Sequence, residues 1–294
     1  MNKLSIIIVS YNTKEILEKC LRSLTANLHK YTFESEVIIV DNSSIDGSQS
    51  QISKIKEQNQ NLKIKTIFNK ENMGYGKANN QGIKIAQGEF ILFLNSDVVV
   101  GDVNFKKVIN YFDSNKKIGV LTTQVVLANG EIDPACHRGF PNPWRAFCYY
   151  IKLEKIFGKF PILNRIFGGY HLTYLNLETI HEIDSPSGAF YLTKKTILDK
   201  VGIFDEKFFM YGEDLDLSFR IKETGYKVIY YPDEKVIHYK YQSGLEAKDN
   251  KTKSKTKEYF YQVMKIFYKK HYEKKYPKVI NSLVDLVINF MNKK

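Results

Sequence analysis

The sequence has little cysteine, and what it has is not arranged for a disulfide framework or a zinc cluster. Its 294 residues include three cysteines, Cys20, Cys136 and Cys148, which lie far apart and form no CxxC pair. Disulfide-rich and zinc-binding domains both need closely spaced cysteines. We therefore expect a protein of the reducing cytoplasm.

A hydrophobic run long enough to cross a membrane is also missing. The N-terminal stretch LSIIIVS is much shorter than the roughly 20 residues that a transmembrane helix requires, and no small-residue cleavage site follows it. We interpret residues 4–9 as a buried strand and not as a signal peptide.

Neither of the two commonest phosphate-binding motifs is present. The segment NMGYGKANNQG has three glycines, but the third is misplaced for the dinucleotide motif GxGxxG, and no GxxxxGK followed by Ser or Thr occurs. Gly74, Gly76 and Gly82 still place small residues along the start of a helix. Backbone amides there can approach a ligand closely.

Positive charge is concentrated at one end of the chain. The net charge is +12, and residues 248–294 carry 13 lysines against four acidic residues, which leaves the remainder nearly neutral. A nucleic-acid-binding protein would carry basic residues and exposed aromatics over its core, so we do not expect one here. Three roles stay open for this basic tail: contact with anionic lipid, packing on the rest of the chain, and contact with a second subunit in a homodimer.

The N-terminal half predicts an α/β fold. Short apolar strands at residues 4–9, 37–40, 62–68 and 90–94 alternate with helical patterns, and strands without polar alternation indicate a parallel sheet covered on both faces. Ligands of such sheets bind beyond the carboxyl ends of the strands. Three strands end in polar residues, which we expect to meet at one edge and to border a nucleotide: Ser10, Tyr11 and Asn12; Asp41 and Asn42; Asn95, Ser96 and Asp97.

The C-terminal half is less regular. Residues 137–182 are rich in aromatic and basic side chains and show no clear periodicity. After them we predict a helix at 213–223, strands at 226–231 and 235–239, a mobile linker at 248–257 and a helical tail beyond it.

Three carboxylates and one histidine are candidates for chemistry. Asp97 ends the strand FLNSDV, where it could bind a divalent cation that offsets the charge of a diphosphate, although the segment alone is more typical of a polar turn. Glu213 and Asp214 lie in the first turn of a helix, where the helix dipole favours acidic residues and where one of them could accept a proton from a hydroxyl. His238 ends an apolar strand, which is usually a structural position but also allows metal ligation.

Seven segments together resemble the family 2 glycosyltransferases, in the order in which that family shows them. They are LSIIIVSYN, VIIVDNSS, NMGYGKANNQG, FILFLNSDVVV, IDSPSGAFYLT, GIFDEKFFMYGEDLDLSFR and VIHYKYQSG. The sequence is most similar to the rhamnosyltransferase-like branch that builds bacterial cell-surface polysaccharide. This resemblance implies a GT-A fold, an α/β fold with a mixed sheet and flanking helices, over residues 1–247. Within it we place an acceptor-side insert at about 137–182, and the apolar pattern beyond it predicts a basic helical tail at 248–294.

The resemblance further implies roles for individual residues. Asp97, as the last position of a DxD-like turn, and His238 would hold Mg²⁺ or Mn²⁺. Asp214, with Glu213 beside it, would supply the catalytic base. The donor would be bordered by residues at the strand ends and along the glycine-containing helix: Ser10, Tyr11, Asn12, Asp41, Asn42, Gly74, Tyr75, Asn79, Asn80, Asn95 and Ser96.

The reaction that this resemblance implies is the inverting transfer of a sugar from a nucleoside diphosphate to a saccharide hydroxyl. The resemblance favours dTDP-rhamnose as donor, with UDP-sugars next. The pathway it implies is cell-surface polysaccharide or O-antigen biosynthesis, with an acceptor anchored by polyprenyl diphosphate at the cytoplasmic face of the inner membrane. The alternative is a non-catalytic nucleotide-sugar-binding protein. A nucleotidyltransferase would need a glycine-rich, basic loop after the first strand, where this chain has SYNTKE.

Overall fold

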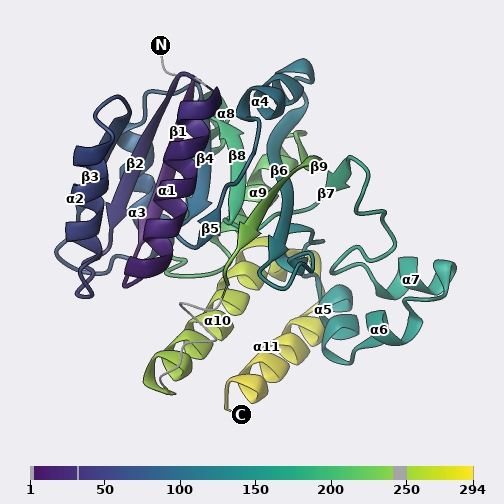
Figure 1. Cartoon of the computed structure of the whole chain (residues 1–294). Coiled ribbons are helices and arrows are strands. Elements are labelled where there is room, and N and C mark those ends of the chain that lie inside the picture. The colour runs from purple at the N-terminus through teal and green to yellow at the C-terminus, as the bar shows by residue number, and fades with distance from the viewer. Residues whose placement is uncertain (1–2, 32, 241–249, 294) are drawn as a thin grey trace.

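One mixed sheet forms the centre of the protein, and helices surround it (Figure 1). The computed structural model describes residues 3–31, 33–240 and 250–293. The strands lie in the order β3-β2-β1-β4-β8-β6-β9-β5, and β7 pairs with β9. Their bounds are β1 Leu4–Ser10, β2 Ser35–Asp41, β3 Lys63–Phe68, β4 Phe90–Asn95, β5 Val98–Val99, β6 Ile118–Leu127, β7 His181–Ile183, β8 Phe190–Lys194 and β9 Lys227–His238.

The first half of the sheet is parallel, as the sequence predicts. β1 pairs with β2 on one side and with β4 on the other, and β3 continues the sheet beyond β2. The register places Ser10 opposite Asp41, and Val9 opposite Asn95. The three polar strand ends therefore lie along one edge of the sheet, which confirms the expectation from the sequence.

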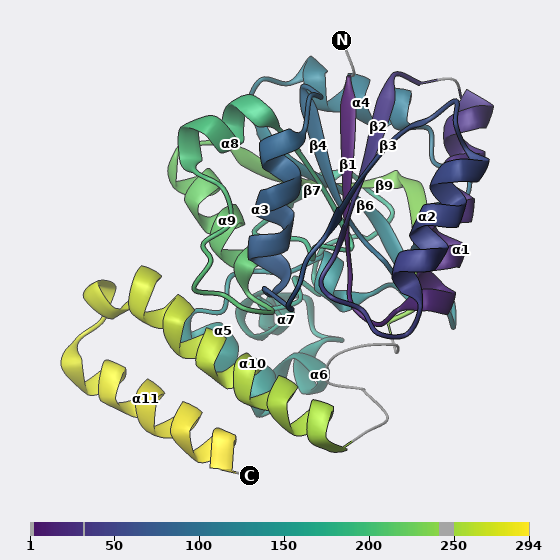
Figure 2. The same ribbon diagram turned by 90° about the vertical axis from the view of Figure 1, so that its left-hand side faces the viewer.

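Helices cover both faces of this part of the sheet, because its strands are apolar on both sides. Figure 2 shows α1 and α2 on one face and α3, α8 and α9 on the other. The bounds are α1 Lys14–Tyr31, α2 Ser48–Gln58, α3 Tyr75–Ile85, α4 Phe105–Ser114, α5 Pro143–Tyr150, α6 Leu153–Phe157, α7 Pro161–Phe167, α8 Lys195–Val201, α9 Glu213–Glu223, α10 Asn250–His271 and α11 Lys278–Lys293; two short 3₁₀ helices are η1 Pro134–Cys136 and η3 Glu273–Lys275.

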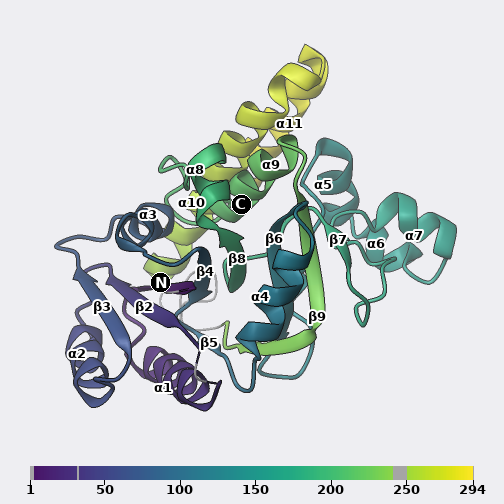
Figure 3. The same ribbon diagram turned by 90° about the horizontal axis from the view of Figure 1, so that it is seen from above.

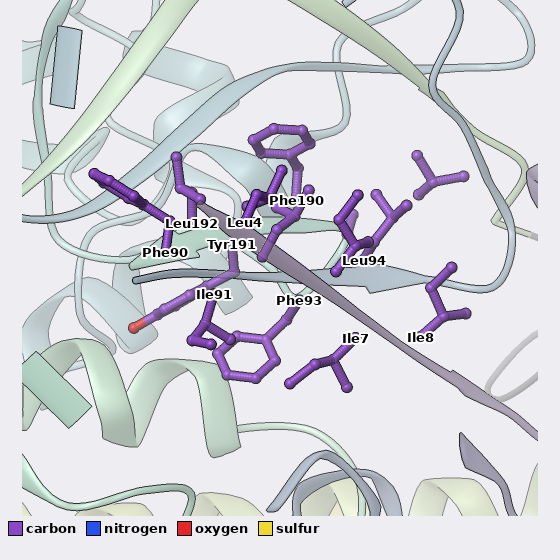
Figure 4. Close-up of a cluster of buried hydrophobic side chains, with 14 of the residues drawn as sticks. Leu4, Ile7, Ile8, Phe90, Ile91, Phe93, Leu94, Phe190, Tyr191 and Leu192 are labelled. Carbon is purple, nitrogen blue, oxygen red and sulfur yellow. The ribbon is translucent and has the colours of Figure 1, made fainter. Parts of the chain in front are cut away.

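The core is centred on β1, β4 and β8 (Figure 4). The Phe93 ring lies 5.9 Å from the Tyr191 ring and 4.7 Å from the Phe204 ring, measured between centroids. On α3, a Cβ atom at Gly82 would come within 2.6 Å of Ile7 Cγ2, so glycine permits the close packing of this helix on β1. Each such buried apolar side chain stabilises the fold by about 1.5–3 kcal/mol. The tightly packed strands hold their polar ends in fixed positions.

The second half of the sheet is mixed. β8 runs antiparallel to β4 and β6, and β9 runs parallel to β6. The prediction of two strands at 226–231 and 235–239 is wrong, because β9 is one strand whose pairing with β6 skips residues 232–234. The acidic side chains of this bulge bind Lys107 on α4. Polar residues that are typical of a turn thus belong to a bulge inside a long strand.

The tail helix α10 packs against the rest of the chain. Its Val263 and Phe267, with Tyr272 directly after the helix, join Phe208 and Phe219 in a second apolar cluster. The prediction of a mobile linker at 248–257 is wrong for residues 250–257, which belong to α10. Residues 248 and 249, and the expected domain boundary at 247, lie outside the described residues. No described helix combines the length and apolar composition needed to cross a bilayer.

The insert that the sequence predicts to be irregular contains three short helices, α5, α6 and α7. Figure 3 shows them extending from the body beside β7. α5 begins with Pro143, and the side chain of Asn142 caps it by accepting a hydrogen bond from the Arg145 N–H. The helices are too short to give a clear hydrophobic period, so capping and aromatic packing define them instead.

Candidate active site

The loops after β1 and β2 are joined at the polar edge of the sheet. Asn12, with φ +53°, accepts a hydrogen bond from the Ile45 N–H at 2.9 Å and donates its own N–H to Ser44 Oγ at 2.8 Å. Asn42 donates from its side-chain amide to the Gly74 carbonyl at 3.1 Å. Two strand ends and the start of α3 thus lie together, as the sequence predicts for a nucleotide site.

Several polar atoms near this edge are buried without a partner among the described residues. Asp41 accepts hydrogen bonds on Oδ1 from the Ser44 N–H and the Gln49 side chain, at 2.9 and 2.8 Å, while its Oδ2 has no donor. Asn79 Oδ1 and Glu213 Oε2 are also buried without a hydrogen-bond partner among the described residues. Buried polar groups are normally satisfied. The acceptor atoms of Asp41 and Asn79 therefore suit a ligand that carries hydroxyl or N–H donors.

The exposed side chain of Tyr11 and the buried turn at Ser96 complete this polar edge. Tyr11 is 44% exposed directly after β1, so its ring is free to pack against a flat ligand group. Thr13 Oγ1 contacts Ser10 Oγ at 3.2 Å and donates to Ser96 Oγ at 3.3 Å, which links the ends of β1 and β4. The predicted site residues of these two strands are therefore neighbours.

The start of α3 is held against the loop that precedes α9. Gly74 has φ +84°, and a Cβ atom there would lie 2.5 Å from the Phe209 carbonyl oxygen, so this approach requires glycine. The Tyr75 N–H donates to that carbonyl at 2.8 Å. Asn80 uses both atoms of its amide on the chain segment at Phe204, donating at 2.9 Å and accepting at 3.1 Å. Asn80 thus fastens α3 to this segment, whereas Asn79 keeps a free acceptor.

Asp97 and His238 are brought together by the pairing of β5 with β9, which places Val98 opposite His238. Nε2 of His238 lies 3.2 Å from Asp97 Oδ1, and Nδ1 lies 2.9 Å from Asp133 Oδ2. Burial by itself would lower the pKa of His238, but the hydrogen bonds to Asp133 and Asp97 raise it to about 9. Burial by itself would raise the pKa of Asp133. The interactions with His238 and Lys240 outweigh burial and hold this pKa well below its ordinary value.

This donor set fits a divalent cation. Mg²⁺ and related ions are often bound by one or two protein groups together with phosphate oxygens and water, and a ligating histidine usually has its second nitrogen hydrogen-bonded to a carboxylate. Asp97, His238 and Asp133 provide such an arrangement, in which a bound cation would replace the proton on Nε2. Within the described parts of the chain, no group of three or more side chains forms a complete metal site. Phosphate oxygens would therefore have to supply further ligands.

Glu213 and Asp214 form the first turn of α9, after Tyr211 and Gly212, both with positive φ. Asp214 Oδ1 accepts from the Leu215 N–H at 2.7 Å, and Oδ2 accepts from Arg138 at 2.8 Å. Burial raises the pKa of Glu213 to about 8, and the charge of Asp214 adds to this shift. Glu213 is thus a neutral acid near pH 7, beside an ion-paired aspartate.

Tyr75 lies near both acidic parts of the site, Asp97 after β4 and the pair Glu213 and Asp214 at the start of α9. Its hydroxyl donates to Asn95 Oδ1 at 2.9 Å, in the turn that carries Asp97. Burial raises the pKa of Tyr75 well above its ordinary value, and the charges of Glu213, Asp214 and Asp97 all add to the increase. A Cβ atom at the neighbouring Gly76 would lie 3.8 Å from Glu213 Cβ, so the start of α3 contacts both the end of β4 and the start of α9.

Two residues of this region were not indicated by the sequence. Asp133 lies in the loop after β6, and Arg138 lies at the start of the insert, and both contact predicted site residues. The available signal was an acidic residue at a strand end, as at Asp41 and Asp97, and Asp133 lacks it because it lies well beyond the end of β6 at Leu127. Arg138 had no such signal, because its pairing with Asp214 depends on the fold of the insert.

Comparisons with known proteins identify the family to which this chain belongs. The family model for glycosyl transferase family 2 matches residues 5–172, which is more than half of the chain. The chain therefore belongs to glycosyltransferase family 2. The N-acetylglucosaminyl-diphospho-decaprenol L-rhamnosyltransferase of Mycobacterium tuberculosis is 25% identical over 251 residues, which cover 81% of this chain and 76% of that protein.

Solved structures show the same fold. TarS 1–349 from S. aureus, in complex with UDP-GlcNAc, aligns over 90% of this chain and 65% of its own with a TM-score of 0.56 and 23% identity. The mannosyltransferase PcManGT from Pyrobaculum calidifontis, in complex with GDP-Man and Mn²⁺, aligns over 90% of this chain and 62% of its own, with a TM-score of 0.57 and 16% identity. These similarities confirm the GT-A fold. The chain spans about a third of the length of other curated relatives, such as a glycosyltransferase of Nostoc sp..

Proposed function

We propose that this protein is a metal-dependent, inverting glycosyltransferase that moves a sugar from a nucleoside diphosphate to a saccharide hydroxyl. The observation that carries the proposal is the convergence of the Asp97–His238 pair and the Asp214 carboxylate on the region around Tyr75. The unpartnered polar atoms on Asp41, Asn79 and Glu213 supply binding groups for a donor between them. The Mn²⁺ and nucleotide sugars in the related structures agree with this reading.

In the proposed reaction, the acceptor oxygen forms a bond to the anomeric carbon while the bond from that carbon to the diphosphate breaks. Asp214 takes the proton of the acceptor hydroxyl. The hydrogen bonds from Arg138 and the Leu215 N–H hold each oxygen of its carboxylate in place and leave a lone pair available. Attack from the side opposite the diphosphate inverts the configuration of the sugar.

Asp97 and His238 are the residues that would hold Mg²⁺ or Mn²⁺ beside the diphosphate. Such a cation offsets the negative charge that grows on the leaving diphosphate. The role of Asp133 is to orient the His238 ring through Nδ1. The base and ribose would be bordered by Ser10, Tyr11, Asn12, Asp41 and Asn42. The ribose and diphosphate side would be lined by Gly74, Tyr75, Asn79 and Asn80.

For the substrates we favour a rhamnosyl donor, dTDP-rhamnose, before a UDP-sugar. The support is the relative from Mycobacterium tuberculosis, which matches most of the chain and is named as an L-rhamnosyltransferase. The name of that enzyme gives its acceptor as N-acetylglucosaminyl-diphospho-decaprenol, which supports a polyprenyl-diphosphate-linked saccharide here and a role in cell-envelope polysaccharide biosynthesis. Such an acceptor would place the enzyme at the cytoplasmic face of the inner membrane.

A panel of nucleotide sugars tests the proposal. Each donor is incubated with the protein with and without Mn²⁺, and both the melting temperature and the release of nucleoside diphosphate are measured. The expected result is one donor class that raises the melting temperature in the presence of Mn²⁺ and is turned over. Stabilisation without any turnover, across donors and acceptors, would favour the alternative of a non-catalytic nucleotide-sugar-binding protein.

A further inference from the structure

The outer face of the insert helices α5, α6 and α7 exposes large apolar side chains. Ile162 is 78% exposed and Phe160 is 57% exposed, and Trp144, Phe147, Ile156 and Ile166 are exposed to a similar degree. Soluble proteins rarely leave such a concentration of aromatic and branched side chains open to water. Phe160 directly precedes α7 and the others belong to α5, α6 and α7, which contact one another, so these exposed side chains lie in one part of the molecule.

These helices and the turns between them carry basic residues without acidic partners. Lys152, Lys155, Lys159 and Arg165 are all exposed, and none of them takes part in an ion pair within the described residues. The one acidic residue among the insert helices, Glu154, is buried and bound to His171. The surface therefore combines apolar side chains with uncompensated positive charge.

Contacts between the insert helices, and between α5 and the rest of the chain, hold the insert in place. The Trp144 ring lies 5.9 Å from the Phe167 ring, and the Trp144 indole N–H donates to the Ile166 carbonyl at 3.1 Å, which ties α5 to α7. Arg145 pairs with Asp184 at 2.6 Å on the side of the body. The exposed side chains are therefore presented on a preformed scaffold and do not need to order on binding.

We propose that the face formed by α5, α6 and α7 docks on a bilayer surface that contains anionic lipid. Apolar side chains would enter the boundary between headgroups and acyl chains, while the lysines and the arginine contact lipid phosphates. Tryptophan and long basic side chains are the residues that favour this boundary. The inference rests on the proposed function in one respect: a lipid-linked acceptor would bring this face to the membrane.

Charge favours a bilayer over a second copy of the chain. A two-fold contact through this face would place the same lysines opposite one another, where like charges repel. The helix α11 offers a contrast, because its exposed stripe of Val279, Leu283, Leu286 and Phe290 is equally apolar but has Asp285 beside it and no basic residue between the lysines at the two ends of the helix, Lys278 and Lys293. An apolar face of this kind lacks the electrostatic component that anionic lipid requires.

The location of the insert links this surface to the site. Arg138, which pairs with Asp214, lies a few residues before α5, and Arg145 on α5 pairs with Asp184 after β7. Figure 1 shows the insert at the end of the molecule where α10 and α11 also lie. Docking through the insert would therefore hold the acceptor side of the site near the lipid surface.

Sedimentation with vesicles tests this proposal on the full chain. Wild-type protein should bind vesicles of phosphatidylcholine with phosphatidylglycerol and should bind poorly to phosphatidylcholine alone. Because each basic residue near an anionic surface strengthens binding about fivefold, the triple change Lys152→Ser, Lys155→Ser and Lys159→Ser should weaken binding about a hundredfold. The double change Phe160→Ser and Ile162→Ser should weaken binding to vesicles of both compositions.

Two matched controls separate this surface from general charge and general apolarity. Lys54→Ser, Lys56→Ser and Lys84→Ser remove the same charge from α2 and α3, and Leu283→Ser with Leu286→Ser removes apolar side chains from α11. Both controls should bind as the wild type does. The proposal is overturned if either control weakens binding as much as the insert variants, or if the wild type does not bind.

Light scattering and nucleoside-diphosphate release distinguish the docking surface from a dimer contact and from the proposed transferase activity. A dimer in light scattering that Ile162→Ser dissociates would assign the face to a second copy and overturn the proposal. Nucleoside-diphosphate release with a soluble acceptor should be the same in all these variants. Release without vesicle binding contradicts only the docking surface, whereas vesicle binding without release for any donor contradicts only the proposed transferase.

Discussion

Arg138 donates through Nη2 to Asp214 Oδ2 at 2.8 Å, and the same nitrogen donates to the Pro186 carbonyl at 2.9 Å. The two side chains are 13% and 11% exposed. The ion pair joins the start of the insert to the first turn of α9. It therefore couples the orientation of the proposed base to the segment that we assign to the acceptor side.

Breaking this pair should destabilise the fold. Arg138→Gln leaves the Asp214 carboxylate buried without a cation, and loss of one partner from a buried pair typically costs about 3–5 kcal/mol. Urea unfolding measures the change in the free energy of unfolding. Arg138→Gln combined with Asp214→Asn should recover most of the loss, and Lys30→Gln, which breaks the exposed pair with Asp102, should have little effect. An Arg138→Gln protein as stable as the wild type would contradict this view of the pair.

Asp133→Asn should weaken metal binding without removing a ligand. Asp133 holds the Nδ1 side of His238, and loss of such an outer partner usually costs about 10–100-fold in metal affinity. Calorimetric titration with Mn²⁺ in the presence of a nucleoside diphosphate measures the Kd. Asp102→Asn, in an exposed loop near β5, is the matched control and should leave the Kd unchanged. An unchanged Kd for Asp133→Asn would argue against His238 as a ligand.

Asp41→Asn should weaken binding of the nucleotide. One carboxylate oxygen of Asp41 is buried without a donor, and a hydrogen bond to a charged acceptor contributes about 1.5–3 kcal/mol. Titration with UDP and dTDP should show a Kd higher by roughly 10–100-fold for the diphosphate that binds the wild type. The exposed Glu71, changed to Gln, serves as the control. Equal affinity in the Asp41→Asn variant would remove this residue from the base and ribose site.

Glu213 should make the stability depend on pH. Burial, with the charge of Asp214, raises its pKa from 4.5 to about 8, so the folded state holds a proton that the unfolded chain releases above about pH 4.5. The stability contribution of this group is therefore complete at low pH and is lost as the pH rises toward 8. Glu213→Gln should match the wild-type melting temperature near pH 5 and exceed it by a few degrees near pH 8. If the difference in melting temperature between Glu213→Gln and the wild type stays constant across this pH range, the pKa of Glu213 is not raised in the folded protein.

The sequence predicts those parts of the site that depend on strand ends. Parallel apolar strands share one direction, so Ser10, Asp41 and Asn95 had to meet at one edge once their strands paired in register. The helix at 213–223 was also predictable, because acidic residues precede an amphipathic pattern. His238 lies near Asp97 through the pairing of β9 with β5.

Other features depend on contacts between distant segments. The bulge at 232–234 keeps β9 continuous because α4 supplies Lys107 for its acidic side chains, and no local signal shows this. Residues 250–257 have the composition of a linker but belong to α10, whose later residues pack on Phe219. The pairing of Arg138 with Asp214 likewise follows from tertiary structure. Local pattern therefore indicates the elements and strand ends, and long-range packing decides how the insert and the tail complete the site.

The most direct test of the proposed base compares donor binding with turnover in Asp214→Asn. This variant keeps the shape of the side chain and removes its basicity, so the donor Kd with Mn²⁺ should stay within about twofold of the wild type, while sugar transfer should fall by about 10²–10⁴-fold. Transfer at the wild-type rate by this variant would contradict the assignment of Asp214 as the base and, with it, the proposed mechanism.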